Sequence, residues 1–141
     1  MAIKTLEYLR GISADDCRRL RQQNILHTNR LLHATTLGID RNRLSARTGI
    51  SADRLLEFGR QCAMLEISGL EPYLAVSHRL GYTGLKQLKH ADADLLHAQF
   101  AESVGLRSAP SRAMVEYWIS QARYQDCMEE PGELTASQTP S

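Results

Sequence analysis

The side chains that could carry catalysis or hold a metal ion are few in this chain, and their spacing does not assemble a familiar site. Cys17, Cys62 and Cys127 are odd in number, lie far apart and form no Cys-x-x-Cys pair, which argues against a disulfide framework and against zinc. His90 and His97 are seven residues apart without an acidic or thiolate partner at metal-binding spacing. We therefore expect no metal site.

Sequence motifs of the common enzyme classes are missing too. The chain has no Gly-x-x-x-x-Gly-Lys phosphate loop, no Gly-x-Ser-x-Gly elbow and no His-Glu-x-x-His pair, and these are the short motifs that carry a defined mechanism. Asp92 and Asp94 fit the start of a helix better than an acid/base pair. We therefore expect no catalytic residue, no enzymatic activity, no cofactor and no small-molecule substrate.

The charges are distributed unevenly. Residues 1–60 hold 11 Lys and Arg against 6 Asp and Glu, whereas residues 128–141 hold three acids and no base. The whole chain carries only +1, which is low for a protein that binds nucleic acid. Any contact with a polyanion is therefore expected in the first half.

The composition indicates a helical protein without a membrane segment. Aromatic residues make up only 6% of the chain within a hydrophobic share of 43%, so the core must consist mostly of Leu, Ile and Ala. No stretch reaches the roughly 18 apolar residues of a membrane span. We expect a cytoplasmic protein with no membrane partner.

One five-residue word occurs twice, and it predicts how the helices are joined. Gly11-Ile12-Ser13-Ala14-Asp15 is repeated at residues 49–53, and weaker echoes follow at residues 69–72 and 105–110. Glycine suits a positive φ that ends a helix, the aliphatic residue turns inward, and serine caps the next helix. Ser13 and Asp16 approximate a capping box.

The periodicity of apolar residues predicts helices between these corners and nothing strand-like. Asn24 is expected to take the left-handed conformation, and Pro72 and Pro110 to lie in first helical turns. Trp118, at helical spacing with Met114 and Val115, is expected in the core, with an interface role as the alternative. The expected helices run from Ile3 to Leu9, from about Ala14 to Gln23, from a cap at Thr28, from a cap at Asp40 to Thr48, from Gly49 to Met64, from a cap at Asp92, and from about Ser111 to Tyr124.

The two halves follow the same plan at an offset of about 57 residues. This offset predicts an all-α fold in which residues 1–127 form one compact domain, with repeat one at about 3–65 and repeat two at about 66–126. Residues 128–141 are polar and acidic, with too little apolar surface to become ordered. We expect them to form a disordered acidic tail.

The first corner carries a resemblance. Leu6-x-x-Leu9-Arg10-Gly11-Ile12-Ser13, followed by Leu20 and Asn24-Ile25, resembles a helix-hairpin-helix motif. The span from about Leu6 to Arg123 resembles the uncharacterised family catalogued as domain of unknown function 4332. The matching stretches include Thr48-Gly49-Ile50-Ser51, Ile67-Ser68-Gly69-Leu70, Gly81-Tyr82 and Val115-Glu116-x-Trp118-Ile119. The resemblance implies tandem helix-hairpin-helix repeats and implies no activity.

The helix-hairpin-helix resemblance implies contact with a phosphate backbone, because backbone amides at such a corner can bind an anion without reading bases. The expected function is non-specific binding of DNA or RNA through the N-terminal hairpin. Glu71 at the matching corner of the second repeat would repel a phosphate. The alternative is a protein-interaction or scaffold domain with a protein partner and no nucleic-acid contact. The expected nucleic-acid-binding residues are Arg10, Gly11, Ile12, Ser13, Arg18, Arg19 and Arg21.

Overall fold

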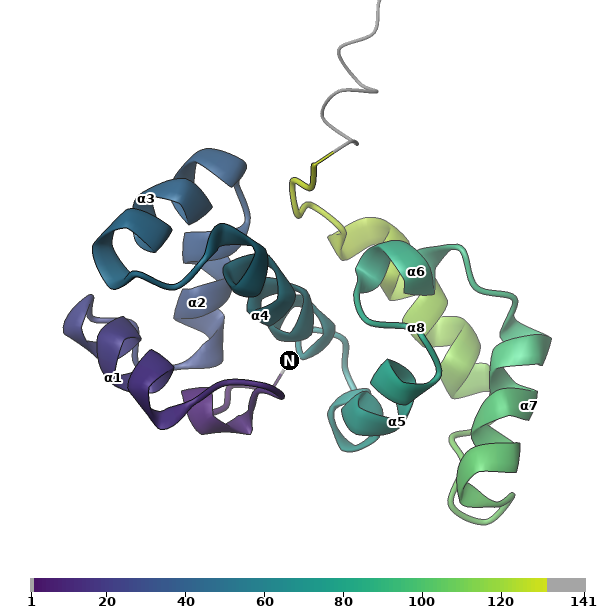
Figure 1. Ribbon diagram of the computed structural model, residues 1–141. Helices are drawn as coiled ribbons and strands as arrows, with labels where there is room; N and C mark the ends of the chain where they lie inside the picture. Colours follow the sequence, from purple (N-terminus) through teal and green to yellow (C-terminus); the bar gives the residue numbers. More distant parts are fainter. Residues whose placement is uncertain (1, 132–141) are drawn as a thin grey trace, which may run out of the picture. The chain divides into compact units, whose positions relative to one another are not determined.

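The computed structural model describes residues 2–131, and the fold is all-α over that range. No strand occurs in residues 2–131, where a single isolated bridge joins Thr5 and His27. The elements are η1 Leu6–Tyr8, α1 Ala14–Gln22, α2 Thr28–Thr35, α3 Gly38–Thr48, α4 Ala52–Met64, η2 Glu71–Tyr73, α5 Leu74–Arg79, α6 Leu85–Lys89, α7 Ala93–Val104 and α8 Arg112–Gln125 (Figure 1).

The helices gather into two compact units. The N-terminal unit comprises Ile3–Cys62 and the segment that starts at Cys127, and the C-terminal unit comprises Ala2 and Ala63–Asp126. The division falls three residues before the predicted boundary between the repeats. No helix in the described range is long and apolar enough to cross a membrane.

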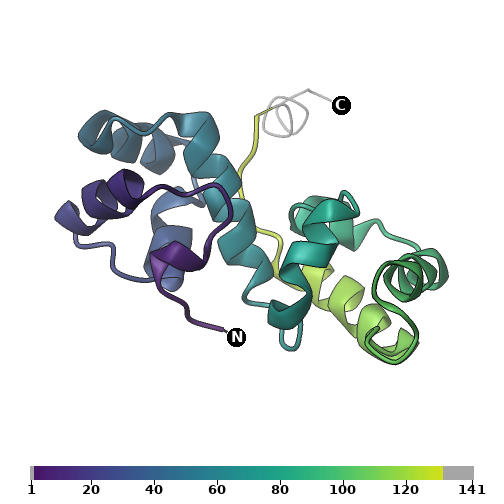
Figure 2. The same ribbon diagram turned by 60° about the horizontal axis from the view of Figure 1, so that its bottom comes forward.

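In the N-terminal unit, α3 packs against α1 and α2, and η1 leads the chain into α1 (Figure 2). The core is built from aliphatic side chains that are almost fully buried, as the composition predicts. Its members include Leu6, Leu20, Leu31, Ile50 and Leu55.

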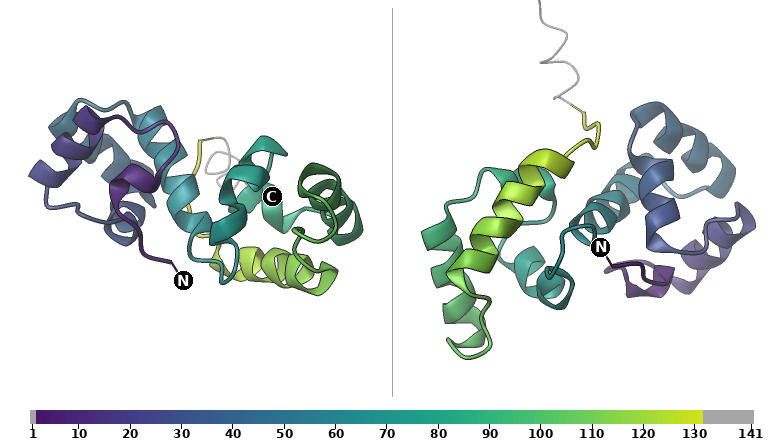
Figure 3. Two further views of the ribbon diagram at one scale, coloured as in Figure 1. Left: turned by 90° about the horizontal axis from the view of Figure 1, so that it is seen from below. Right: turned by 180° about the vertical axis from the view of Figure 1, so that it is seen from behind.

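In the C-terminal unit, α8 is the central helix and packs against α6 and α7 (Figure 3). Trp118 of α8 is fully buried and forms an aromatic cluster with Tyr73 and Phe100 at centroid distances of 5.4 Å and 5.8 Å. Its indole nitrogen donates to the carbonyl of Ser68 at 3.2 Å. The predicted core position of Trp118 is confirmed.

A buried carboxylate holds α6 to the end of α8 in the same unit. Asp126 accepts hydrogen bonds from Lys86 at 2.9 Å and Lys89 at 2.6 Å, and its side chain is 2% exposed. Burial alone would raise the pKa of Asp126, but the hydrogen bonds and charges of Lys89 and Lys86 outweigh it, so the pKa lies below its ordinary value.

The predicted chain reversals are confirmed in their backbone conformation. Gly11, Gly49, Gly69 and Gly105 have φ between +76° and +85°, and Asn24 is the one non-glycine residue among the described ones with positive φ, at +61°. The corners after α1 and α5 share one hydrogen-bond pattern, in which the third residue after the helix donates five positions back: Ile25 to Leu20 at 3.1 Å, and Tyr82 to Ser77 at 3.0 Å.

The predictions of helix starts were partly wrong. Asp92 and Ser111 do cap α7 and α8. Thr28 does not cap α2, because its hydroxyl accepts from the amide of Lys4 at 3.0 Å. Asp40 lies inside α3, whose start carries no side-chain cap from its own N-cap residue, Leu37.

Three further local predictions need correction. The segment Ile3–Leu9 forms only the short 3-10 helix η1, with Ile3 exposed, because residues around Lys4 pair with the start of α2 instead of coiling. Pro110 precedes the N-cap Ser111 and therefore lies outside the first turn of α8. Leu106 is 80% exposed and does not turn into the core.

The start of the predicted disordered tail packs against the N-terminal unit. We call residues 127–131 the C-terminal strap. Met128 is 6% exposed, and its methyl lies 3.0 Å from the position that a Cβ at Gly59 would occupy. The amide of Glu129 donates to Thr36 at 2.8 Å, and its carboxylate accepts from the amide of Gly38 at 3.1 Å. Residues 132–141 of the predicted tail lie outside the described residues.

The strap also brings carboxylates to two buried or half-buried arginines. Glu130 accepts from the Nε of Arg60 at 3.0 Å. Burial would lower the pKa of Arg60, but the hydrogen bond from Glu130 and the nearby charges raise it overall. Arg41, only 5% exposed, has its pKa lowered by burial despite the charges of Glu129 and Glu130. The strap therefore supplies compensating charge to the unit.

Candidate nucleic-acid interface

The first corner begins α1 with a complete capping box, as predicted. The amide of Asp16 donates to the Ser13 hydroxyl at 3.0 Å, and the amide of Ser13 donates to the Asp16 carboxylate at 3.0 Å. The Asp16 carboxylate therefore already accepts the hydrogen bond of the Ser13 amide, which was predicted to bind phosphate. Hydrogen bonding from Arg54 lowers the pKa of Asp16 against the opposing effect of burial, so this carboxylate is charged at neutral pH.

The preceding part of the same corner is open. Within residues 2–131 the amide of Gly11 has no hydrogen-bond partner, whereas the amide of Ile12 closes the loose turn that Arg10 and Gly11 make. A Cβ at Gly11 would meet no atom within 4 Å. An open amide at the exposed end of a corner suits one anionic oxygen.

Arg10 lies directly beside the amide of Gly11. Its backbone is held on both sides by Gln61, which accepts from the Arg10 amide at 2.8 Å and donates to the Arg10 carbonyl at 3.1 Å. The guanidinium is exposed and has no carboxylate partner among the described residues. The fixed backbone and the uncommitted charge make Arg10 the cation best placed to assist the Gly11 corner.

The other three predicted arginines are committed to acidic or carbonyl partners. Arg18 pairs with Asp15. Arg19 pairs with the same carboxylate at 2.8 Å and donates to the carbonyl of Thr48 at 3.1 Å. Arg21 pairs with Glu7 at 2.6 Å, and this hydrogen bond is the main reason why the pKa of Glu7 is lowered. These pairs reduce the positive charge that α1 presents to an anion.

The second copy of the repeated word lies against the first. Arg54 of α4 donates to Asp16 at 3.0 Å and to the carbonyl of Gly11 at 3.3 Å. Asp16 follows Ser13 by three positions, and Arg54 follows Ser51 by three positions. Asp16 and Arg54 are therefore equivalent in the two copies. Because residue 54 is arginine, no carboxylate reaches the amide of Ser51, which lacks a partner in the described part of the chain.

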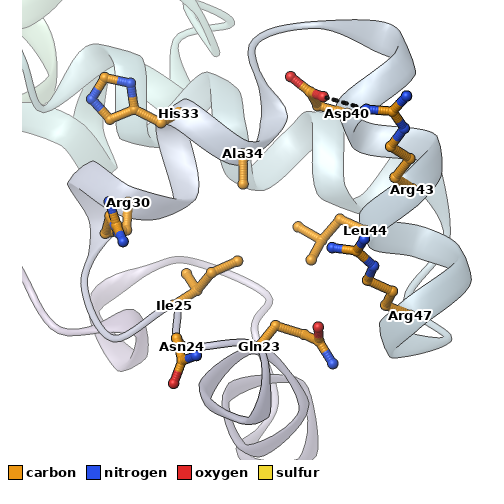
Figure 4. A pocket seen from close by; sticks show the side chains of 10 residues that line it. All are labelled: Gln23, Asn24, Ile25, Arg30, His33, Ala34, Asp40, Arg43, Leu44 and Arg47. Atoms are coloured by element: carbon orange, nitrogen blue, oxygen red, sulfur yellow. Dashed lines mark ion pairs between the residues drawn. The ribbon is translucent and has the colours of Figure 1, made fainter.

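A pocket of 390 Å³ lies in the same unit, at the end of α1 and between α2 and α3 (Figure 4). Arg30 and His33 come from α2, and Arg43 and Arg47 from α3. The sequence shows the spacing of four between Arg43 and Arg47, but Arg30 belongs to another helix and no local pattern connects it to them. Sequence reasoning therefore missed this cluster.

The family is decided by a match over most of the chain. A family model described as domain of unknown function 4332 matches residues 10–125. The chain belongs to this family. The DUF4332 region includes both copies of the repeated word and every residue that lines the pocket. Searches of curated proteins and of solved structures gave no significant match.

The corresponding corner of the second half of the DUF4332 region is built differently. A Cβ at Gly69 would lie 3.6 Å from the indole nitrogen of Trp118, whereas a Cβ at Gly11 would meet no atom within 4 Å. Glu71 lies in the first turn of η2.

Within residues 2–131, no group of three or more His, Cys, Asp or Glu side chains is arranged to hold a metal ion.

Proposed function

We propose that the N-terminal unit binds the phosphate backbone of DNA or RNA through the hairpin at Arg10–Ser13, without reading bases and without catalysis. The observation that carries the proposal is the partnerless amide of Gly11 beside the uncommitted guanidinium of Arg10. Backbone amides bind a phosphate oxygen irrespective of sequence, and arginine adds a charge-assisted hydrogen bond.

The roles of the other predicted residues follow from their partners. Ser13 serves as the helix cap, because its amide and hydroxyl are both bonded to Asp16. Arg18 pairs with Asp15 and Arg21 with Glu7, so each of these arginines would bind a phosphate while its charge is partly neutralised by a carboxylate. Their contribution is therefore smaller than that of Arg10.

The charge distribution also supports binding of a polyanion by the N-terminal unit. Residues 3–62 carry a net charge of +5, which Glu129 and Glu130 of the strap reduce to +3 for the described part of the unit, and residues 63–126 carry −1. A concentrated cationic unit releases condensed counterions from a polyanion, which is the main source of non-specific affinity.

A reducing compartment such as the cytoplasm fits the free thiols of Cys17, Cys62 and Cys127.

We propose further that the two units are tandem helix-hairpin-helix repeats. Helix starts support an offset of 57 residues: Ala14 of α1 against Glu71 of η2, and Thr28 of α2 against Leu85 of α6. The matched hydrogen bonds of Ile25 and Tyr82 lie at the same offset.

A protein-interaction role remains the second candidate, and one observation favours it in the C-terminal unit. Leu95 of α7 is 56% exposed, Tyr117 of α8 is 46% exposed, and Leu106 between these helices is 80% exposed. Large exposed apolar side chains suit a protein surface better than a polyanion.

Fluorescence anisotropy with short labelled single- and double-stranded DNA and RNA at two salt concentrations tests the proposal. We expect salt-sensitive binding that Arg10→Glu weakens by about tenfold or more, since a phosphate contact is lost and a repulsive charge is added. Arg107→Glu is the matched control, because Arg107 is an exposed arginine of the C-terminal unit without a partner in the described residues. An equal effect of the two variants would contradict the assigned site, and absence of binding at low salt would favour the protein-interaction role.

A further inference from the structure

The pocket between α2 and α3 combines an apolar floor with a cationic rim. Ile25, Ala34 and Leu44 lie at its centre, and the side chains of Arg30, Arg43 and Arg47 stand around it (Figure 4). A volume of 390 Å³ is within the range of about 300–1,000 Å³ that small-molecule sites occupy. The shape and lining therefore suit a ligand that has both an apolar and an anionic part.

The arginines of this pocket are poorly compensated by the protein. Arg30 and Arg47 have no acidic partner within residues 2–131. Arg43 has a long ion pair with Asp40 at 3.8 Å. Most other arginines of the unit have close carboxylate or carbonyl partners, so the pocket stands out as a place where positive charge is left available.

The charge of the lining indicates which anion fits. Three arginines and Asp40 leave a charge of +2 with His33 neutral. A phosphate monoester carries about −1.5 to −2 at neutral pH, whereas a phosphodiester of a nucleic-acid backbone carries −1. Guanidinium groups bind phosphate oxygens in bidentate geometry. The monoester is the better match.

We propose that this pocket binds a phosphate monoester carried on a small organic group. The phosphate contacts the arginines of α2 and α3, and the organic group covers Ala34 and Leu44. Two sources offer this chemistry, a free mononucleotide or sugar phosphate and the 5′-phosphate at the end of a nucleic-acid chain. The inference uses side chains other than those of the Arg10 corner and does not depend on nucleic-acid binding there.

Isothermal titration calorimetry with AMP, adenosine and ribose 5-phosphate tests the pocket. We expect the two phosphorylated compounds to bind at least about tenfold more tightly than adenosine, since each charged hydrogen bond contributes strongly. Arg30→Gln and Arg47→Gln should each weaken AMP binding by about tenfold, and Arg107→Gln should leave it unchanged. These arginines are exposed, and far-ultraviolet circular dichroism of each variant verifies that the fold is retained.

Competition with oligonucleotides of one sequence, bearing either a 5′-phosphate or a 5′-hydroxyl, identifies the source. Stronger competition by the phosphorylated chain than by AMP supports a chain end, and stronger competition by AMP supports a free small molecule. The inference is overturned if neither AMP nor ribose 5-phosphate binds more tightly than adenosine and the 5′-phosphate gives no advantage. It is also overturned if Arg30→Gln and Arg47→Gln bind AMP as the wild type does. Because Arg10→Glu probes the other site, each proposal can fail while the other holds.

Discussion

Removal of the C-terminal strap should destabilise the N-terminal unit, although its sequence is typical of a disordered tail. We compare a variant that ends at Cys127 with one that ends at Pro131. The first loses the buried side chain of Met128 and the hydrogen bonds of Glu129 and Glu130, whereas the second keeps all of these contacts. The two variants differ by only four residues, so tail length is closely matched, and the two charges by which they differ are those of Glu129 and Glu130, whose contacts are under test.

The expected change in the free energy of unfolding is a small difference between two large contributions. The contacts of the strap stabilise the unit, and the entropic cost of ordering the strap opposes them. Burial of a methionine contributes about 1.5–3 kcal/mol, and the hydrogen bonds of the two glutamates contribute about 3 kcal/mol together. Ordering the backbone of three residues costs about 3–6 kcal/mol, and fixing their side chains costs more. Because the two sums nearly cancel, we expect a net loss at the lower end of the range for removing a buried methionine, about 2 kcal/mol, which corresponds to roughly 8–16 °C in melting temperature for a unit of this size.

Met128→Ala provides a second test of the same reasoning. A methionine-to-alanine change in a core costs about 2–5 kcal/mol, but the strap can detach once its anchor is lost. The effect of the substitution therefore cannot exceed that of removing the strap, and we expect both to lower stability by about 2 kcal/mol.

Thermal unfolding followed by far-ultraviolet circular dichroism measures these changes, and fluorescence of Trp118, the single tryptophan of the chain, reports on the C-terminal unit. The variant ending at Pro131 should melt like the full chain. A variant ending at Cys127 that melts like the full chain would refute the docked strap. A larger loss from Met128→Ala than from truncation would refute the detachment argument.

Three further substitutions test the electrostatics and the corners. Asp126→Asn should lower stability at neutral pH by about 2–3 kcal/mol by removing the buried carboxylate that binds Lys86 and Lys89. Because the folded-state pKa of this carboxylate is lowered, its stabilisation is present above the unfolded-state value of about 4 and is lost as the pH falls through the folded-state value. Acid titration of the Trp118 fluorescence transition should therefore bring the variant and the wild type together. Gly11→Ala should cost about 1–2 kcal/mol for its positive φ alone, whereas Gly49→Ala should cost about 1 kcal/mol more in urea unfolding, because the new Cβ would lie 2.9 Å from the Arg19 guanidinium and disturb its bond to Thr48.

Sequence reasoning succeeded where the physical cause is local. A positive φ at Gly11 or Asn24 and a cap at Asp92 depend on a residue and its immediate neighbours. The same reasoning failed for Thr28 and Asp40, because local rules do not register partners that are distant in the sequence. The hydroxyl of Thr28 is bound by Lys4, 24 positions earlier.

The start of α3 shows how far such a partner can lie along the chain. The free amide at Gly38 is bound by the carboxylate of Glu129, 91 positions away. Composition predicted that this acidic residue belongs to a disordered segment, since few apolar residues surround it. The packing of Met128 beside Gly59, the hydrogen bond from the Glu129 amide to Thr36 and the pairing of Glu130 with Arg60 hold this segment at the helix. The start of α3 does have a side-chain cap, but the cap is Glu129, near the C-terminal end of the described residues, and not Asp40.

The two copies of the repeated word cannot be equivalent, although their five residues are identical. The difference lies one position beyond the word, where the first copy has Asp16 and the second has Arg54. Asp16 closes the amide of Ser13, and Arg54 leaves the amide of Ser51 open while neutralising Asp16. This pairing requires opposite charges at equivalent positions, so an exact repeat of either version would place two like charges together. Asymmetry between the copies is therefore a condition of their packing, and an anion that binds near them meets two different corners.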